Sequence, residues 1–132
     1  GSLYTSIIPN LLVEKVPEAI EKSGAVKVYV CNIMTQPGET ENYTVADHLE
    51  ALFKHAGCRC VDYCLVNNGP IEPSLLARYK EEGAAPVELD IQRTRRLGVK
   101  VIEENMVGII NGYVRHDPDK LARAILDTFK GR

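Results

Sequence analysis

Short runs of apolar and β-branched residues, separated by longer segments of helical periodicity, place the strongest constraint on the fold of this chain. Four runs are predicted to be strands, and a fifth is a candidate edge strand: 25–31, 60–66, 86–90, 99–102 and 107–111. Near-continuous apolar runs between helices are typical of strands that are buried on both faces of a parallel sheet. The pattern therefore predicts an α/β protein in which a mostly parallel sheet lies between two layers of helices.

Three segments have the sequence features of long helices, namely 42–55, 72–82 and 117 to the carboxyl terminus. Segment 42–55 places its apolar residues on one side and ends before a glycine. The last helix has a clear start, because Asp117 is a good N-cap residue and Pro118 suits the first helical position. These helices supply the outer layers of the predicted sheet.

The opening segment is predicted to form two helices, 3–12 and 16–22, with no strand before them. In α/β proteins a strand normally precedes a glycine turn of this kind. We therefore expect that the sheet lacks one or more upstream strands. On this interpretation residues 1–132 form a single α/β domain fragment.

Composition excludes some functions. The formal net charge is −2, whereas a nucleic-acid or anionic-membrane partner would favour a basic face. No apolar run approaches the length of a membrane span. We therefore expect neither nucleic-acid binding nor membrane insertion.

The chain has four cysteines, Cys31, Cys58, Cys60 and Cys64. Three of them are close together, but their spacing lacks the C-x2-C pair of structural zinc sites. Buried, reduced thiols are the better prediction, since free cysteine prefers protein interiors. Reduced thiols in turn predict a reducing, cytosolic compartment.

Polar loops follow several predicted strands, at the positions where ligands bind in doubly wound sheets. These loops are 32–40, 67–70 and 112–117. Together with the opening turn at residues 1–6, they are expected to form one polar rim.

The opening turn from Gly1 to Ser6 can be interpreted in two ways. A glycine followed by hydroxyl residues at a helix start can bind phosphate through unpaired amides. Alternatively, Ser2 only caps the helix, or the first two residues are a cloning remnant, and the residues alone favour these simpler explanations. Asn32 and Asn67 could bind a base or a sugar, or they could simply stabilise turns.

Arg115 stands just before the predicted start of the last helix. There a diphosphate would meet both a guanidinium group and the positive end of a helix dipole. The alternative is a surface arginine paired with Asp117 or Asp119. Tyr79 lies on the apolar stripe of its helix, so its position alone predicts a core residue.

The histidines and the remaining arginines give weaker indications. His48 and His55 have no third metal ligand in register, so we predict that they lie on a solvated face or at its boundary. His116 could act in acid–base chemistry, but no nucleophile lies beside it in the sequence. Arg93, Arg95 and Arg96 are predicted to lie on a solvated loop or helix face. No catalytic motif emerges from the residues.

Two long strings resemble the YvcK family of proteins, which is related to the CofD phospholactate transferases. They are GSLYTSIIPNLL at 1–12 and VYVCNIMTQPGET at 28–40, and shorter matches occur at 47–49, 65–67 and 78–84. The resemblance spans essentially this whole chain but only the carboxyl-terminal part of the family's length. It implies that an amino-terminal half with its own nucleotide-binding turn is absent from this sequence.

The resemblance implies a three-layer, Rossmann-like fold of the CofD type and a cytoplasmic bacterial protein. Family members bind UDP-sugars, notably UDP-N-acetylglucosamine, and are needed for cell shape and cell-wall synthesis during gluconeogenic growth. No catalytic activity is established for them, so a regulatory binding protein is expected. The alternative is a CofD-type phosphotransferase acting on a nucleotide diphosphate substrate, whose magnesium ligands would lie in the absent half. No cofactor, metal ligand or catalytic residue is therefore expected within this chain.

The resemblance also assigns ligand-binding positions. Tyr79 and Arg115 fall where the family contacts its ligand, which replaces the core interpretation of Tyr79 and favours the ligand-binding interpretation of Arg115. The full expected set is Gly1, Ser2, Tyr4, Thr5, Ser6, Asn32, Asn67, Tyr79 and Arg115. The expected partner is a UDP-sugar or related nucleotide, and a homodimer and cell-wall synthesis proteins are further partner hypotheses.

Overall fold

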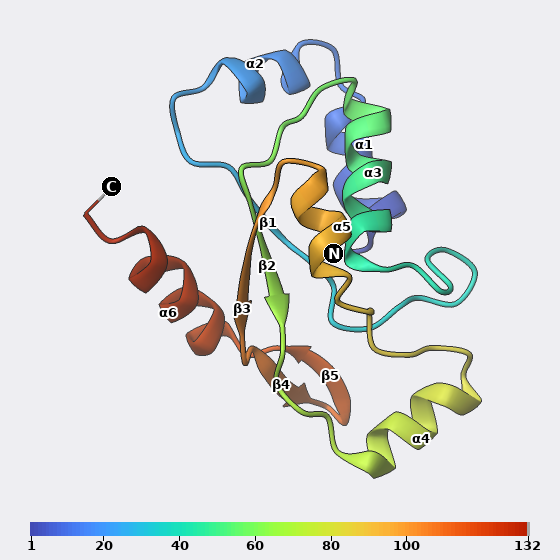
Figure 1. The fold of residues 1–132 in the computed structure, drawn as a ribbon. Helices are drawn as coiled ribbons and strands as arrows, with labels where there is room; N and C mark the ends of the chain where they lie inside the picture. Colours follow the sequence, from blue (N-terminus) through green and yellow to red (C-terminus); the bar gives the residue numbers. More distant parts are fainter. Residues whose placement is uncertain (132) are drawn as a thin grey trace.

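A parallel three-stranded sheet forms the centre of the computed structural model, which describes residues 1–131 (Figure 1). The strands are β1 (Val28–Val30), β2 (Tyr63–Asn67) and β3 (Lys100–Glu104), in the order β1-β2-β3. Both pairings are parallel, with Tyr29 opposite Cys64 and Cys64 opposite Val101. The predicted parallel sheet is therefore confirmed, with shorter strands than the apolar runs suggested.

Helices cover both faces of the sheet, and a hairpin that forms a separate two-stranded sheet lies beyond one end of it (Figure 1). The opening π-helical turn η1 (Leu3–Ile7) leads into α1 (Ile8–Leu11). The other helices and the hairpin strands are α2 (Val16–Lys22), α3 (Val45–Ala56), α4 (Pro73–Glu81), α5 (Ile91–Arg96), β4 (Val107–Ile110), β5 (Tyr113–His116) and α6 (Pro118–Phe129). No helix among residues 1–131 combines the length and the apolar character that crossing a membrane requires.

The alternation of side chains along β2 divides the core into two layers. Cys64 and Val66 point to the side where η1, α1 and α3 supply Leu3, Ile8 and Leu49. The opposite face is covered differently: Leu65, Met106 and Ala124 of α6 form a separate cluster there. This is the three-layer arrangement that the sequence predicts.

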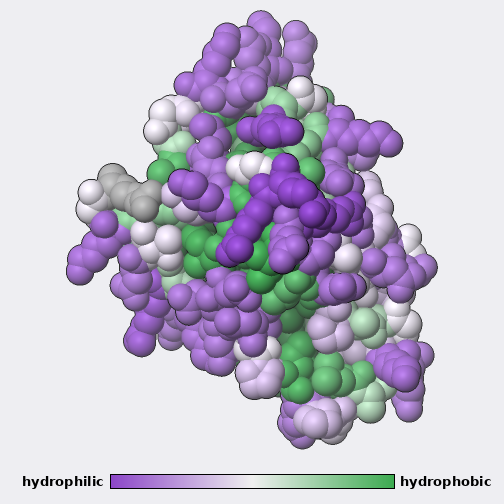
Figure 2. Space-filling model, in the orientation of Figure 1, coloured by the Kyte–Doolittle hydropathy of each residue, from purple (hydrophilic) through white to green (hydrophobic). Residues whose placement is uncertain are grey.

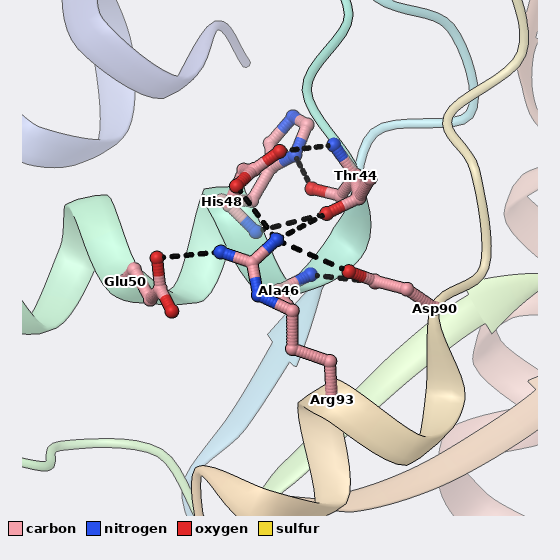
Figure 3. Close-up of polar contacts among 7 residues, drawn as sticks. Thr44, Ala46, His48, Glu50, Asp90 and Arg93 are labelled. Carbon is pink, nitrogen blue, oxygen red and sulfur yellow. Dashed lines mark hydrogen bonds and ion pairs between the residues drawn. The ribbon is translucent and has the colours of Figure 1, made fainter.

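The start of α3 is fixed by a capping box. The Thr44 side chain accepts a hydrogen bond from the Asp47 amide at 3.2 Å, and the Asp47 carboxylate accepts one from the Thr44 amide at 2.9 Å. The guanidinium group of Arg93 in α5 binds this cap, with Nη1 2.9 Å from Asp47 Oδ1. Its Nη2 atom also lies 2.7 Å from Glu50 Oε2 (Figure 3). The predicted solvated face is thus correct for Arg95 and Arg96, which are exposed, but Arg93 joins two helices.

Residues 86–90, predicted to be a strand, form none. Pro86 pairs with Met34, and Glu88 pairs with Thr44, each as an isolated β-bridge outside any strand. Pro86 lacks an amide hydrogen and cannot donate to a ladder, and the chain turns into α5 directly after Asp90. The segment therefore serves as a connection that crosses the loop after β1.

Residues 113–117, predicted to be part of a loop, instead contain strand β5. It pairs antiparallel with β4, which confirms the candidate strand at 107–111, and Ile110 lies opposite Tyr113. The two-residue turn between the strands is Asn111-Gly112, with φ angles of 51° and 76°. Positive φ at both positions is the geometry of a type I′ turn, which asparagine and glycine tolerate.

The buried side chains include one that was predicted to be solvated. His48 is fully buried, with 0% exposure, whereas His55 is exposed as expected. His48 lies on the same helical stripe as Val45 and Leu52, and its Nδ1 contacts the Thr44 carbonyl oxygen at 2.8 Å. Burial lowers the pKa of His48, because the charged ring would lose its hydration.

All four cysteines are free thiols, as predicted. Cys31, Cys60 and Cys64 are buried, and Cys58 is partly buried. The pKa of Cys31 is raised by a hydrogen bond with Cys64 and by burial, and burial raises the pKa of Cys60 to about 11. Buried thiols with a raised pKa are poor nucleophiles, so Cys31 and Cys60 have packing roles.

Candidate functional site

A cleft of about 980 Å³ lies at the carboxyl end of β1. Its walls come from the opening turn, β1 and the loop after it, the end of α4, strand β5 and one residue of α6. In Figure 2, apolar surface runs through the middle of the molecule and towards the end formed by α4, β4 and β5, and hydrophilic residues border it. The cleft occupies the position at which parallel α/β sheets bind their ligands.

Six of the nine predicted ligand-binding residues line this cleft. They are Gly1, Ser2, Ser6, Asn32, Tyr79 and Arg115. The other three, Tyr4, Thr5 and Asn67, do not contribute to its walls. The structure therefore brings together residues that are more than 100 positions apart in the sequence.

The opening turn packs tightly against itself. The Ser2 carbonyl oxygen accepts hydrogen bonds from the amides of Ser6, at 2.9 Å, and Ile7, at 3.0 Å. A Cβ atom placed on Gly1 would lie only 2.8 Å from the Ser6 Cβ, so the close approach requires glycine. The Ser2 hydroxyl oxygen lies 3.4 Å from Gln36 Nε2, which joins the turn to the loop after β1.

Three predicted residues have other partners or positions. The hydroxyl groups of Tyr4 and Tyr43 are 2.7 Å apart, and this hydrogen bond raises the pKa of Tyr4 to about 12. Thr5 is exposed outside the cleft. Asn67 stabilises the turn after β2, because its Oδ1 accepts hydrogen bonds from the amides of Gly69 and Met106. Turn chemistry, one of the two alternatives for Asn67, is thus what this structure displays.

Tyr79 is buried, with 7% exposure, although it borders the cleft. It belongs to a small apolar cluster with Ile33, Met34 and Val114. Its hydroxyl oxygen accepts a hydrogen bond of 2.9 Å from the amide of Val114, the residue before Arg115. Tyr79 thereby fixes the strand that positions Arg115, whatever further contact it makes with a ligand.

Arg115 is exposed at the rim of the cleft and forms no ion pair with any described residue. Its guanidinium group lies 5.3 Å from the centre of the Tyr113 ring and donates to the Val114 carbonyl oxygen at 2.9 Å. Pairing with Asp117, one of the alternatives, does not occur. The Asp117 carboxylate instead caps α6, accepting from the amides of Asp119 and Lys120 at 3.0 Å.

This cap also changes the expected role of the last helix. The amides of Asp119 and Lys120 already have a carboxylate partner, so they are not available to an anion. A ligand near Arg115 would therefore be held by side chains and not by the start of α6.

His116 is a cleft residue to which the sequence assigned no partner. Burial lowers its pKa, and a hydrogen bond with the Cys31 backbone opposes this. Its Nε2 atom is buried and has no hydrogen-bond partner within the described structure. At neutral pH the ring is therefore uncharged and can exchange hydrogen bonds with a ligand without the cost of burying a charge.

Sequence reasoning missed several other residues of the cleft. The loop after β1 contributes Gln36 and Glu39, α4 contributes Glu82, and β5 contributes Tyr113. The sequence did place the loop at 32–40 on the expected polar rim, but no pattern within it distinguished Gln36 and Glu39 as cleft residues. Within residues 1–131, no group of three or more histidine, cysteine or acidic side chains could hold a metal ion.

Similarity to known proteins covers most of the chain. A profile of the family described as 2-phospho-L-lactate transferase CofD matches residues 1–107. The gluconeogenesis factor of Bacillus subtilis is 48% identical over 130 residues, which cover 98% of this chain and 41% of that protein. A gluconeogenesis factor of Listeria innocua is 42% identical, over 96% of this chain and 38% of its own length.

The fold is also shared with a solved structure. A crystal structure of a UPF0052 family protein from Bacillus halodurans superimposes with a TM-score of 0.91 at 47% identity, over 96% of this chain and 41% of that chain. The chain thus spans about two fifths of the length of these relatives. With its three-layer, Rossmann-like fold and a family match over most of its residues, this chain belongs to the CofD family and is similar to its gluconeogenesis factors.

Proposed function

We propose that this chain forms part of a regulatory protein that binds a nucleotide sugar, with UDP-N-acetylglucosamine as the ligand. The observation that most supports this is Arg115, an arginine without an acidic partner in the described structure, at the rim of a cleft beyond a parallel strand. A guanidinium group in this position is suited to a phosphate group, with which it can form two parallel hydrogen bonds.

The remaining cleft residues suit the rest of such a ligand. Ser2, Ser6 and Asn32 offer hydroxyl and amide groups of the kind that hydrogen-bond to sugars and bases. Ile33 and Val114, which belong to a buried apolar cluster, give the cleft partly apolar walls. This combination of apolar walls and a few polar groups is typical of small-molecule sites.

Calorimetric titration with UDP-N-acetylglucosamine tests the proposal. It uses the full-length protein, meaning this chain together with the additional sequence that its relatives possess. Arg115→Ala is expected to weaken binding about tenfold or more, because a charge-assisted hydrogen bond is lost. Arg96→Ala is the matched control, since Arg96 is also exposed, on α5, but does not line the cleft. Unchanged affinity of the Arg115 variant would show that the arginine has no part in binding.

A second candidate function is a CofD-type phosphotransferase acting on a nucleotide diphosphate substrate. The family match over residues 1–107 favours it. In this case the metal ligands would come from sequence outside this chain, because no suitable group of three occurs within residues 1–131. The test is a screen of nucleotide diphosphate substrates with the full-length protein, with and without magnesium. Magnesium-dependent product formation would establish the enzyme, and its absence would favour the binding protein.

We further propose that the protein acts in the cytoplasm, in cell-wall synthesis and the maintenance of cell shape during growth on gluconeogenic carbon sources. The similarity to gluconeogenesis factors supports this role. A regulator should bind its protein partners differently with and without ligand. Purification of the tagged protein with and without UDP-N-acetylglucosamine would distinguish a sensor from a passive scaffold, for which the captured partners would be the same.

A further inference from the structure

Two arginines, not one, contact the aromatic ring beside the cleft. Arg78 of α4 lies with its guanidinium carbon 5.2 Å from the centre of the Tyr113 ring, and Arg115 lies 5.3 Å from the same centre. Tyr113 and Arg115 both line the cleft, and they point to the same side of β5 because they are two residues apart. We call Arg78, Tyr113 and Arg115 the arginine pair and its ring.

The position of Arg78 is set by the hairpin turn. Its guanidinium group donates a hydrogen bond to the carbonyl oxygen of Gly112. Gly112 has a φ of 76°, a conformation that strongly favours glycine, so this carbonyl is presented by a defined type I′ turn. The guanidinium group also lies 5.8 Å from the Tyr79 ring. Arg78 is therefore held in place by backbone and by aromatic rings, none of which neutralises its charge.

Neither arginine has an acidic partner. The ion pairs within residues 1–131 all involve Lys22 or Arg93. Glu82, one helical turn beyond Arg78 and at the cleft wall, forms no ion pair with it. Two like charges placed around one ring repel each other, and an anion bound beside both would relieve that repulsion.

We propose that Arg78, which does not line the cleft itself but lies against the Tyr113 ring that does, is a second anion-binding residue, and that the arginine pair and its ring bind the diphosphate of a nucleotide ligand. This inference rests on the proposed function and adds a residue and a chemical preference to it. Two cations suit two phosphate groups, so the pair selects diphosphates over monophosphates. Tyr113 is a positioning residue that holds both guanidinium groups by cation–π contact.

The test compares UDP with UMP as probes in calorimetric titrations of the full-length protein. Arg78→Gln is expected to weaken UDP binding about tenfold or more and to change UMP binding less than twofold, because one remaining arginine still serves one phosphate. Arg78→Lys keeps the charge but loses the planar fork, so it should retain part of the preference for UDP. Arg96→Gln, on α5 and outside the cleft lining, is the matched control and should change neither affinity.

The outcomes separate the two hypotheses. If the unchanged protein binds neither UDP nor UDP-N-acetylglucosamine, the proposed function is wrong. If it binds UDP and Arg78→Gln binds UDP equally well, the proposed function stands and this inference is wrong. Equal weakening of UDP and UMP would also overturn it, since that result would mean that Arg78 only maintains the hairpin. The inference is supported if Arg78→Gln unfolds at the same temperature as the unchanged protein but has lost the preference for UDP over UMP.

Discussion

At the scale of single residues, Asp47 shows how one carboxylate can stabilise several elements. Burial by itself would raise the pKa of Asp47, but hydrogen bonds from Thr44 and Arg93 outweigh it, so the pKa lies below its ordinary value. Its contribution to stability is therefore complete above the pKa of the unfolded chain, about 4, and is lost as the pH falls through the lower pKa of the folded state.

This linkage predicts the behaviour of Asp47→Asn. The variant should be about 1 kcal/mol less stable at pH 7, because the capping box loses its charged acceptor. Below pH 4 the difference from the unchanged protein should shrink. The measurement is the free energy of unfolding in urea between pH 2 and pH 7. Asp127→Asn, at an exposed position of α6, is the control and should leave the profile unchanged. A constant difference across the whole pH range would contradict the prediction.

His48 shows what residue-level patterns miss. Its polar character predicted solvent exposure, yet it shares an apolar stripe with Val45, Leu49 and Leu52 at helical spacing. That spacing was visible in the sequence and correctly indicated burial. The Thr44 carbonyl oxygen that contacts the ring belongs to the N-cap residue of the same helix. The Nδ1 atom of His48 therefore has a partner within its own helix and needs no distant residue.

At the scale of elements, Tyr79 joins α4 to β5 by a single hydrogen bond to the Val114 amide. Tyr79→Phe removes the acceptor and leaves a buried amide unpaired, so we expect a loss of about 1–2 kcal/mol in the free energy of unfolding. Binding of UDP-N-acetylglucosamine should weaken as well, because the strand next to Arg115 is less firmly held. Tyr43→Phe is the matched control, since it loses a hydroxyl bonded to Tyr4 away from the cleft. Equal stability of the Tyr79 variant and the unchanged protein would refute this expectation.

The elements with the clearest local periodicity were the ones that the sequence predicted correctly. Strands β1, β2 and β3 and helices α3 and α6 have strong local patterns, and all were predicted from the sequence. Residues 86–90 misled because alternation over five residues also fits an extended connection, and only the tertiary structure determines whether a partner strand is adjacent. Strand β5 could have been predicted, because Asn111-Gly112 is a strong hairpin turn.

The site was less predictable than the fold. Asn32 was placed at the polar rim by the rule that ligands bind beyond parallel strands, whereas the family resemblance decided the ligand-binding interpretation of Ser2 and Arg115. The contacts of Arg78 with Tyr113 depend on how α4 packs against the hairpin, and no local pattern specifies that packing. Tyr79 was assigned to a ligand, and the structure adds a hydrogen bond within the protein that sequence spacing does not reveal.

At the scale of the whole molecule, the cleft is bordered by β1, which pairs with β2 alone among the described strands. The relatives are more than twice as long as this chain. We therefore expect residues 1–132 alone to bind UDP-N-acetylglucosamine at least tenfold more weakly than the full-length protein, because fewer groups enclose the ligand. Titration of both proteins measures this, after circular dichroism shows that the short chain is folded. Equal affinities would mean that this chain contains the complete site.

The bond between Tyr79 and Val114 has a consequence for communication across the molecule. Helix α4 presents exposed residues on its outer side, while its buried tyrosine is bonded to the strand that holds Arg115. A protein that docked on α4 and displaced it would displace Arg115 too. Thermodynamic reciprocity then requires that occupation of the cleft changes the affinity for that docking protein by the same factor. One tyrosine hydroxyl thus connects the state of a small-molecule site to a surface that other proteins can reach.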